Sequence, residues 1–217
     1  MRDFFNSESP IMSFLGRVAD LVWLNLLTLI CCIPVVTAGA ALTALHYVSI
    51  KLAREEEGYL TKSYFKSLKE NFFQATALWL LMLLIFAVAW ADLYFISMMD
   101  SQVASVMRIG VCAVFFFYLC GGIYWFPLLA RFDNSLKNII KNACLLGILN
   151  FPKSLCILVI YGVFAAGYTL LFYRILPIIF LVGISLPVYT ASCLFSGIFK
   201  KLEPQDAEAS EEIGQSV

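Results

Sequence analysis

The sequence predicts an all-α membrane protein, a bundle of about five transmembrane helices with amphipathic helices on the cytoplasmic face. Composition is the first observation behind this prediction: 61% of the 217 residues are hydrophobic, 14% are charged, and the mean hydropathy is +0.85. Soluble globular domains carry about 25% charged residues. The second observation is a series of uncharged runs, each near or above the roughly 20 residues that a helix needs to cross about 30 Å of hydrocarbon. These runs are apolar on every face, whereas the strands of a membrane barrel alternate.

The uncharged runs and the charges that bound them place the expected spans. We predict them at about residues 17–36, 72–96, 104–127, 153–173 and 176–199. Together they form a helical membrane domain of residues 1–202. Residues 203–217 hold five acidic and no basic residues, a composition typical of a solvated, disordered tail.

The first apolar run, between Asp20 and Lys51, is too long for one upright span and too short for two. Its Ala-Gly-Ala at residues 38–40 resembles a signal-peptide cleavage site, and a break in the run would also fit a membrane hairpin. We prefer a third interpretation, in which one span ends at Pro34, because proline removes a backbone donor and disfavours helical geometry at the preceding residue. Thr37 would then cap a second helix that bends along the inner membrane surface.

Basic residues predict the orientation, because cytoplasmic loops hold the excess of Lys and Arg. If the first span runs from outside to inside, only Arg2, Arg17, Arg108 and Arg174 of the 15 basic residues fall outside. A hairpin or a cleaved signal peptide would instead move the basic residues of 51–69 to the outside. We therefore predict a multi-pass cell-membrane protein with its N-terminus outside and its C-terminus in the cytoplasm.

Two inner segments have the pattern of basic amphipathic helices that lie in the membrane interface. Residues 60–75 repeat apolar side chains every four positions, with Lys66 and Lys69 elsewhere around the helix, and residues 128–147 turn Lys137 and Lys141 away from an apolar face. The segments share letters at an offset of 68 residues, which fits either a duplicated hairpin or a coincidence of membrane composition. The expected partners are membrane lipid, transporter subunits or a second copy of the chain, and no nucleic acid.

The sequence lacks the motifs of phosphate loops, nucleophile elbows and zinc proteases. The only histidine, His46, is expected to be a structural residue facing the interface on the helix after Pro34. We therefore expect no enzyme, no catalytic residue, no metal and no cofactor. Asn25 lies deep in the first span, where an amide ordinarily forms an inter-helix hydrogen bond of roughly 1 kcal/mol.

Several of these residues together resemble the YesL-like group of bacterial integral membrane proteins, a family without an established biochemical activity. The resemblance covers the chain except for its acidic tail. It is carried by Asn25, Pro34, Thr37, Gly39, residues 44–48, Lys51, the acidic-glycine turn at residues 56–58, Phe65 and the later FPLLARFDNSLKN, which contains Pro127 and Phe132.

The resemblance implies a function without naming a substrate. Members are often encoded beside carbohydrate-uptake transporters, so an accessory or regulatory role in carbohydrate uptake is expected. This chain lacks the E-A-A…G motif that importer permeases present to their ATPase. The alternative is a small stand-alone transporter or channel.

Overall fold

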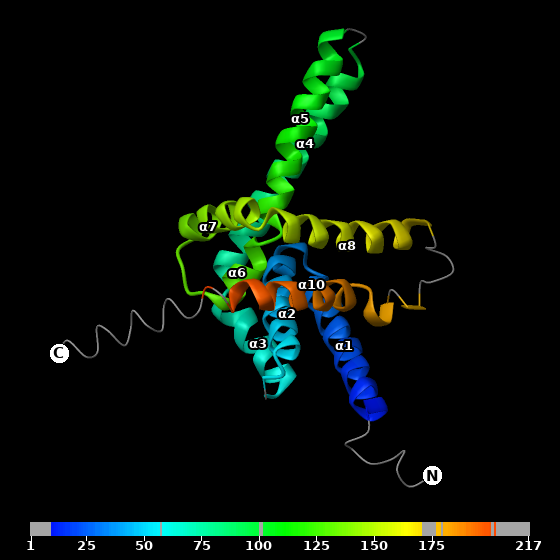
Figure 1. The fold of residues 1–217 in the computed structure, drawn as a ribbon, viewed down its shortest axis with the longest axis vertical. Coiled ribbons are helices and arrows are strands. Elements are labelled where there is room, and N and C mark those ends of the chain that lie inside the picture. Colours follow the sequence, from blue (N-terminus) through cyan, green and yellow to red (C-terminus); the bar gives the residue numbers. More distant parts are fainter. Residues whose placement is uncertain are drawn as a thin grey trace, which may run out of the picture.

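The computed structural model describes residues 10–56, 58–99, 102–170, 177–178, 180–200 and 202, and these form helices and their connections (Figure 1). The elements are α1 (Pro10–Cys32), the 3₁₀ turn η2 (Val35–Thr37), α2 (Ala38–Ala53), α3 (Leu60–Glu70), α4 (Phe72–Ser97), α5 (Gln102–Gly122), α6 (Trp125–Arg131), α7 (Leu136–Leu149), α8 (Phe151–Leu170) and α10 (Ser185–Phe199). The acidic tail at residues 203–217 lies outside the described residues.

Six of the described helical segments are long and apolar enough to cross a membrane, which confirms the all-helical membrane class. They are Met12–Cys32, Val35–Ala53, Phe72–Ser97, Val103–Arg131, Phe151–Leu170 and Phe180–Phe199. The additional candidate, beyond the five predicted spans, is Val35–Ala53, which was predicted as a surface helix.

The candidate spans run in different directions (Figure 1). The hairpin of α4 and α5 projects from the body of the molecule, α8 and α10 run crosswise to it, and α1, α2 and α3 extend to the opposite side (Figure 1). The two ends of the hairpin connect to the body through α3 and α6. The body therefore holds most of the contacts between segments distant in sequence.

The centre of the body is α2, which packs against α1, α3, α4, α6 and α10. Ala40, Ala41, Ala44, Leu45 and Val48 are fully buried in it. The prediction that this helix lies along the membrane surface was therefore wrong. That prediction was based on the charges around the helix. Charges carry no information on how closely small side chains let other helices approach.

The break at Pro34 is confirmed. Helix α1 ends at Cys32, and Pro34 has extended backbone angles of φ −77° and ψ 117°. The capping role predicted for Thr37 was wrong, because its side chain makes no bond to the start of α2. The Thr37 hydroxyl instead donates to the carbonyl oxygens of Cys31 and Pro34, at 2.8 Å for Pro34, and so covers the end of α1.

Helices α2 and α4 meet at Gly39. A Cβ atom built there would lie 2.5 Å from both the Ala75 carbonyl oxygen and the Trp79 Cβ. A second close contact joins α7 to α5, where a Cβ on Gly147 would lie 2.7 Å from the Cys120 carbonyl oxygen. Only glycine allows backbones to approach this closely.

The amphipathic character of residues 60–70 is confirmed in α3. Tyr64 is buried at the centre of its apolar face, and its hydroxyl lies 3.3 Å from both the Ala41 carbonyl oxygen and Thr28 Oγ1. Burial raises the pKa of Tyr64, so the hydroxyl stays neutral. Lys66 and Lys69 are exposed on the opposite face.

Residues 128–147 form two helices, and their predicted continuity was wrong. Helix α6 ends at Arg131, residues 132–135 are not helical, and α7 begins at Leu136. The offset of 68 residues therefore aligns the middle of α3 with a connection.

A structural correspondence does exist at Asn71 and Asn150, 79 residues apart. Each asparagine ends one helix, donates to the carbonyl oxygen four residues earlier, and is followed by the phenylalanine that begins the next helix.

Candidate functional site

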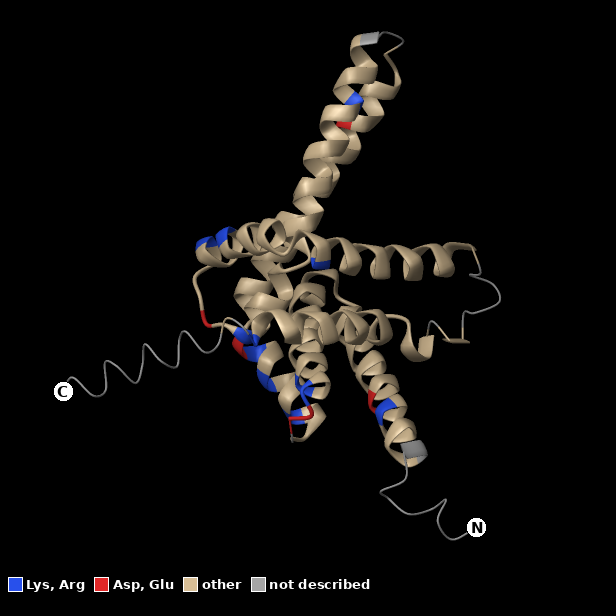
Figure 2. Cartoon of the chain, viewed as in Figure 1, with Lys and Arg blue, Asp and Glu red and all other residues tan. Residues whose placement is uncertain are grey.

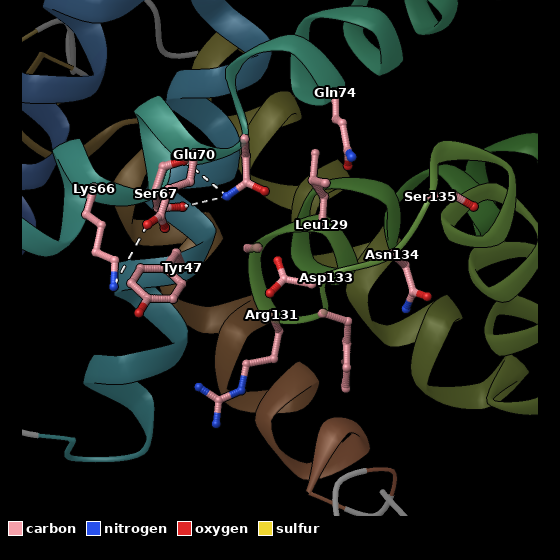
Figure 3. Close-up of a pocket in the computed structure, with 13 residues that line it drawn as sticks. Tyr47, Lys66, Ser67, Glu70, Gln74, Leu129, Arg131, Asp133, Asn134 and Ser135 are labelled. Atoms are coloured by element: carbon pink, nitrogen blue, oxygen red, sulfur yellow. Dashed lines mark hydrogen bonds and ion pairs between the residues drawn. The ribbon is translucent and has the colours of Figure 1, made fainter.

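A polar cavity lies where the end of α3 and the start of α4 face the connection between α6 and α7 (Figure 3). Its volume is about 670 Å³. We call it the polar pocket, and its lining residues are Tyr47, Lys66, Ser67, Glu70, Asn71, Gln74, Leu129, Ala130, Arg131, Phe132, Asp133, Asn134 and Ser135.

The polar pocket balances opposite charges. Lys66 forms an exposed ion pair with Glu70 one turn on, with Nζ 3.9 Å from the carboxylate, and Arg131 faces the same cavity as Asp133. The amides of Asn71, Gln74 and Asn134 add both donors and acceptors. The arrangement can hydrogen-bond a ligand that carries both kinds of group, and it holds no constellation of nucleophile and base.

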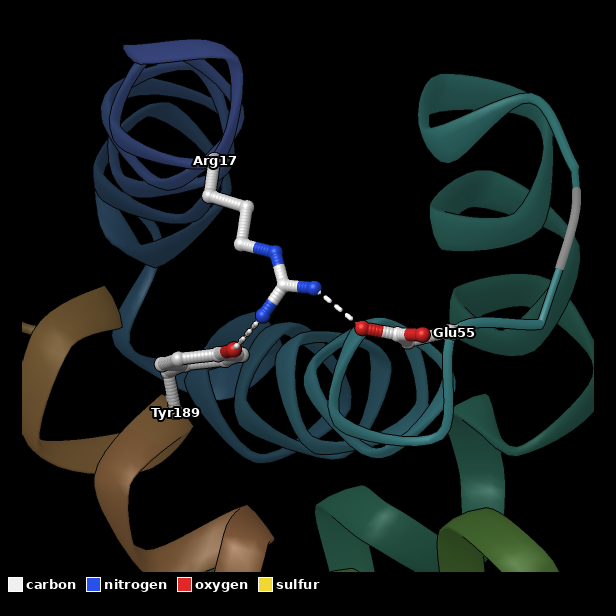
Figure 4. Close-up of polar contacts among 3 residues, drawn as sticks. All are labelled: Arg17, Glu55 and Tyr189. Carbon is white, nitrogen blue, oxygen red and sulfur yellow. Dashed lines mark hydrogen bonds and ion pairs between the residues drawn. The ribbon is translucent and has the colours of Figure 1, made fainter. Parts of the chain in front are cut away.

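A second polar cluster surrounds the acidic turn after α2. The Arg17 guanidinium of α1 pairs with Glu55 and lies 3.4 Å from the Tyr189 hydroxyl of α10 (Figure 4). The next residue, Glu56, lies 3.9 Å from Arg54 and 3.5 Å from Arg131 at the end of α6. Glu55 adopts a positive φ of 57°, which turns the chain sharply between α2 and α3.

These ion pairs place several chain segments at one end of the body. The N-terminal part of α1, the C-terminal end of α2 and the end of α6 all meet at Glu55 and Glu56. Helices α1 and α2 therefore form an antiparallel hairpin. The predicted orientation had put Arg17 and Arg54 on opposite sides of the membrane, and the hairpin removes the basis for that separation.

Asn25 forms the inter-helix hydrogen bonds expected of it. The side chain is fully buried, its Nδ2 donates to the Phe180 carbonyl oxygen at 2.7 Å, and its Oδ1 accepts from the backbone N–H groups of Ile184 and Ser185 at 2.8 and 3.1 Å. The N–H groups at the start of α10 have no acceptor within their own helix, and Asn25 of α1 supplies one. Its role is to join the two ends of the chain.

The basic residues of the two predicted amphipathic segments lie apart. Lys66 lines the polar pocket and Lys69 is exposed on α3, whereas Lys137 and Lys141 are exposed on α7. The basic residues of α7 and those of α3 lie in different places on the molecule (Figure 2). Only the α3 group adjoins the polar pocket.

Two further residues of the predicted motif lie near the polar pocket. Pro127 is buried within α6, and Phe132 lines the pocket and packs edge-to-face on Phe199 with ring centroids 5.5 Å apart. Of the charged and amide residues of the pocket, Lys66 was predicted as an interaction residue, whereas Asp133, Asn134 and Gln74 were not. The polar residues after Arg131 indicate a connection between two helices. The prediction of one continuous helix over residues 128–147 did not take them into account.

The fold and the polar pocket together define a multi-pass helical membrane protein with a ligand-sized polar cavity at one end. Residues 21–93 match the family model DUF624, described as a protein of unknown function. The matched stretch runs from α1 into α4 and covers about a third of the chain, including Asn25, Pro34, Thr37 and Gly39. Comparison with curated proteins and with solved structures found no match.

Proposed function

We propose that this protein is a non-enzymatic membrane component that assists or regulates a carbohydrate-uptake system by holding a polar segment of a transporter subunit in the polar pocket. The observation that supports the proposal is the charge balance of the pocket: Lys66 and Arg131 lie with Glu70 and Asp133 around one cavity of about 670 Å³. The assignment to carbohydrate uptake comes from the family resemblance.

The same balance favours a protein segment over a lipid headgroup. Anionic headgroups are attracted by an excess of Lys and Arg, at about 1 kcal/mol for each nearby basic residue. Here Glu70 and Asp133 would repel a phosphate from the cavity that the basic residues line. A peptide segment presents donors, acceptors and charges of both signs, which the pocket can match.

We further propose that both termini and the polar pocket lie on the cytoplasmic side. The Arg17–Glu55 and Arg131–Glu56 pairs gather the N-terminal part of α1 and the end of α6 at the acidic turn that follows Lys51 and Arg54. Phe199 at the end of α10 packs on Phe132 beside the polar pocket. An excess of basic residues marks the cytoplasmic side. The hairpin of α1 and α2 also moves Arg17 from the outside to this basic side. An internal N-terminus thus agrees with the basic residues better than the external one predicted from a single span.

An N-terminal reporter tests the orientation. A fusion that is active only in the cytoplasm should be active at the N-terminus and when inserted at Gly58, and inactive when inserted in the connection between α4 and α5. The Gly58 and α4–α5 insertions serve as controls, because both orientations predict the same result for them. An N-terminal fusion active only outside the cell would restore the external N-terminus.

Site-specific photo-crosslinking in cells tests the docking proposal. A photoreactive residue at Gln74 or Ser135, both of which line the polar pocket, should crosslink to a transporter subunit during growth on an inducing sugar. The matched control position is Lys141 on α7, which is exposed and does not line the pocket. We expect several-fold more crosslinked product from the pocket positions.

Charge reversal completes this experiment. Asp133→Lys should abolish the crosslink from Gln74, because it destroys the charge balance, and Lys141→Glu should leave it unchanged. Equal crosslinking from Lys141, or none from the pocket positions under inducing conditions, would refute the docking proposal. Flux of sugar or ions into vesicles that contain only the purified protein would favour the stand-alone transporter or channel.

A further inference from the structure

A large apolar cavity beside α2 has a composition unlike that of the polar pocket. Its volume is about 670 Å³. Residues of α2, α4, α5, α6 and α8 line it, together with residues 183–188 at the start of α10. No Asp, Glu, Lys or Arg is among its described lining residues. The size falls within the range of about 300–1,000 Å³ typical of small-ligand sites.

Two polar groups on the wall of this apolar cavity are buried without a partner among the described residues. His46 on α2 is 5% exposed and its Nδ1 has no hydrogen-bond partner, and the Tyr118 hydroxyl on α5 likewise has none. Leaving such a group unpaired costs about 1–3 kcal/mol. The expectation that His46 faces the membrane interface was wrong, since the packing of α10 and α4 around α2 encloses it.

The apolar cavity shares the lining residue Tyr118 with a neighbouring groove. That groove lies between α4 and α5, has a volume of about 450 Å³, and is lined mainly by apolar side chains such as Leu84, Val88 and Val114, with Asp92 as its one charged lining residue. A chain that begins at His46 and Tyr118 can therefore extend outward along the hairpin. The shape fits one long apolar chain rather than a compact molecule.

We propose that this cavity binds a single-chain neutral lipid, such as a prenol, a fatty alcohol or a monoacylglycerol, with its oxygen hydrogen-bonded to His46 and Tyr118 and its chain along the α4–α5 groove. The lining of the cavity around His46 and Tyr118 is uncharged, and the one charged residue of the groove, Asp92, is acidic, so no group compensates a buried phosphate or carboxylate head group. The oxygen of the lipid supplies the partner that the two buried groups lack. This site is independent of the polar pocket and of the proposed transporter partner.

Photo-labelling of the purified full-length protein in vesicles tests the proposal. The probe is a sixteen-carbon monoacylglycerol carrying a diazirine and an alkyne. It should label peptides of α4 and α5 around Leu83 and Tyr118, and unlabelled monoacylglycerol should compete at least tenfold better than phosphatidylglycerol or palmitate. Tyr118→Phe, which removes only the hydroxyl, should reduce labelling about five- to tenfold, and His46→Phe should do the same.

A blocking variant provides a test that does not depend on the polar groups. Gly122 lines the apolar cavity, and a Cβ there would meet nothing within 4 Å, so Gly122→Leu can fill the cavity without a clash at its Cβ. It should abolish the labelling. Gly162→Leu on α8 is the matched control, because a Cβ at Gly162 also meets nothing within 4 Å and the residue does not line the cavity.

Three outcomes would overturn the proposal. Labelling spread over all lipid-facing helices and unaffected by Gly122→Leu would show annular lipid only. Equal competition by phosphatidylglycerol would exclude a neutral ligand. Wild-type labelling in Tyr118→Phe and His46→Phe together would show that water, rather than a lipid oxygen, satisfies the two buried groups.

Discussion

Asn25→Leu should lower the free energy of unfolding by about 2–4 kcal/mol, the largest effect expected of any single polar substitution in this chain. The amide bonds three backbone groups of residues 180–185, and leucine of similar size leaves all three without this partner, the Ser185 N–H in a buried place and the other two in partly buried places. Each such loss costs about 1–3 kcal/mol in water-soluble proteins and less in a membrane. The measurement is unfolding of the purified protein in mild detergent, followed by circular dichroism as SDS is added.

Thr43→Val is the matched control for Asn25→Leu. Thr43 is also fully buried, but its hydroxyl donates at 2.9 Å to the Gly39 carbonyl oxygen within the same helix. The Gly39 carbonyl oxygen belongs to the hydrogen-bond ladder of the helix itself. Loss of the hydroxyl hydrogen bond should therefore lower the free energy of unfolding by less than about 1 kcal/mol. An Asn25→Leu protein as stable as Thr43→Val would show that the contact between α1 and α10 carries no stability.

Gly39→Ala should destabilise the protein by about 1–3 kcal/mol, although alanine is the better helix former. The new methyl group would lie 2.5 Å from the Ala75 carbonyl oxygen and the Trp79 Cβ, so α2 and α4 must move apart. Since α2 is the centre of the body, this displacement should also reduce the yield of monodisperse protein. Thermal unfolding monitored by size-exclusion chromatography measures both effects.

Gly162→Ala on α8 separates the contact from the change in helix propensity. A Cβ at Gly162 meets nothing within 4 Å, so this variant should be neutral or more stable by up to about 1 kcal/mol. Gly147→Ala should behave like Gly39→Ala, because its Cβ would lie 2.7 Å from the Cys120 carbonyl oxygen. Equal stability of Gly39→Ala and Gly162→Ala would contradict the close approach of α2 and α4.

Much of the fold could be predicted because its causes are local. The span at 72–96 differs from α4 by one residue, since uncharged length is a property of the run itself. Pro34 ends α1 through its own ring and missing N–H, and the four-residue spacing of α3 buries Tyr64. The inter-helix role of Asn25 followed from the cost of an unpaired amide at membrane depth.

The errors have a common physical origin in contacts between distant residues. The charge pattern around α2 describes its ends, and it carries no information on the five helices that enclose the middle of α2. The pairing of Arg17 with Glu55, 38 residues away, likewise leaves no local signal in the sequence. The alignment at an offset of 68 residues compared residue types alone. It did not include the break between α6 and α7.

By itself the sequence determined the class of protein, the approximate ends of the apolar helices and the break after α1. Those features follow from hydrophobicity, proline geometry and helical spacing, which act over a few neighbouring residues. Only the tertiary structure decided that α2 is central, that α1 and α2 form a hairpin, and that His46 and Tyr118 line one apolar cavity. The physical reason is that close packing at Gly39 and pairing at Glu55 join segments whose separation in the chain leaves no periodic signal.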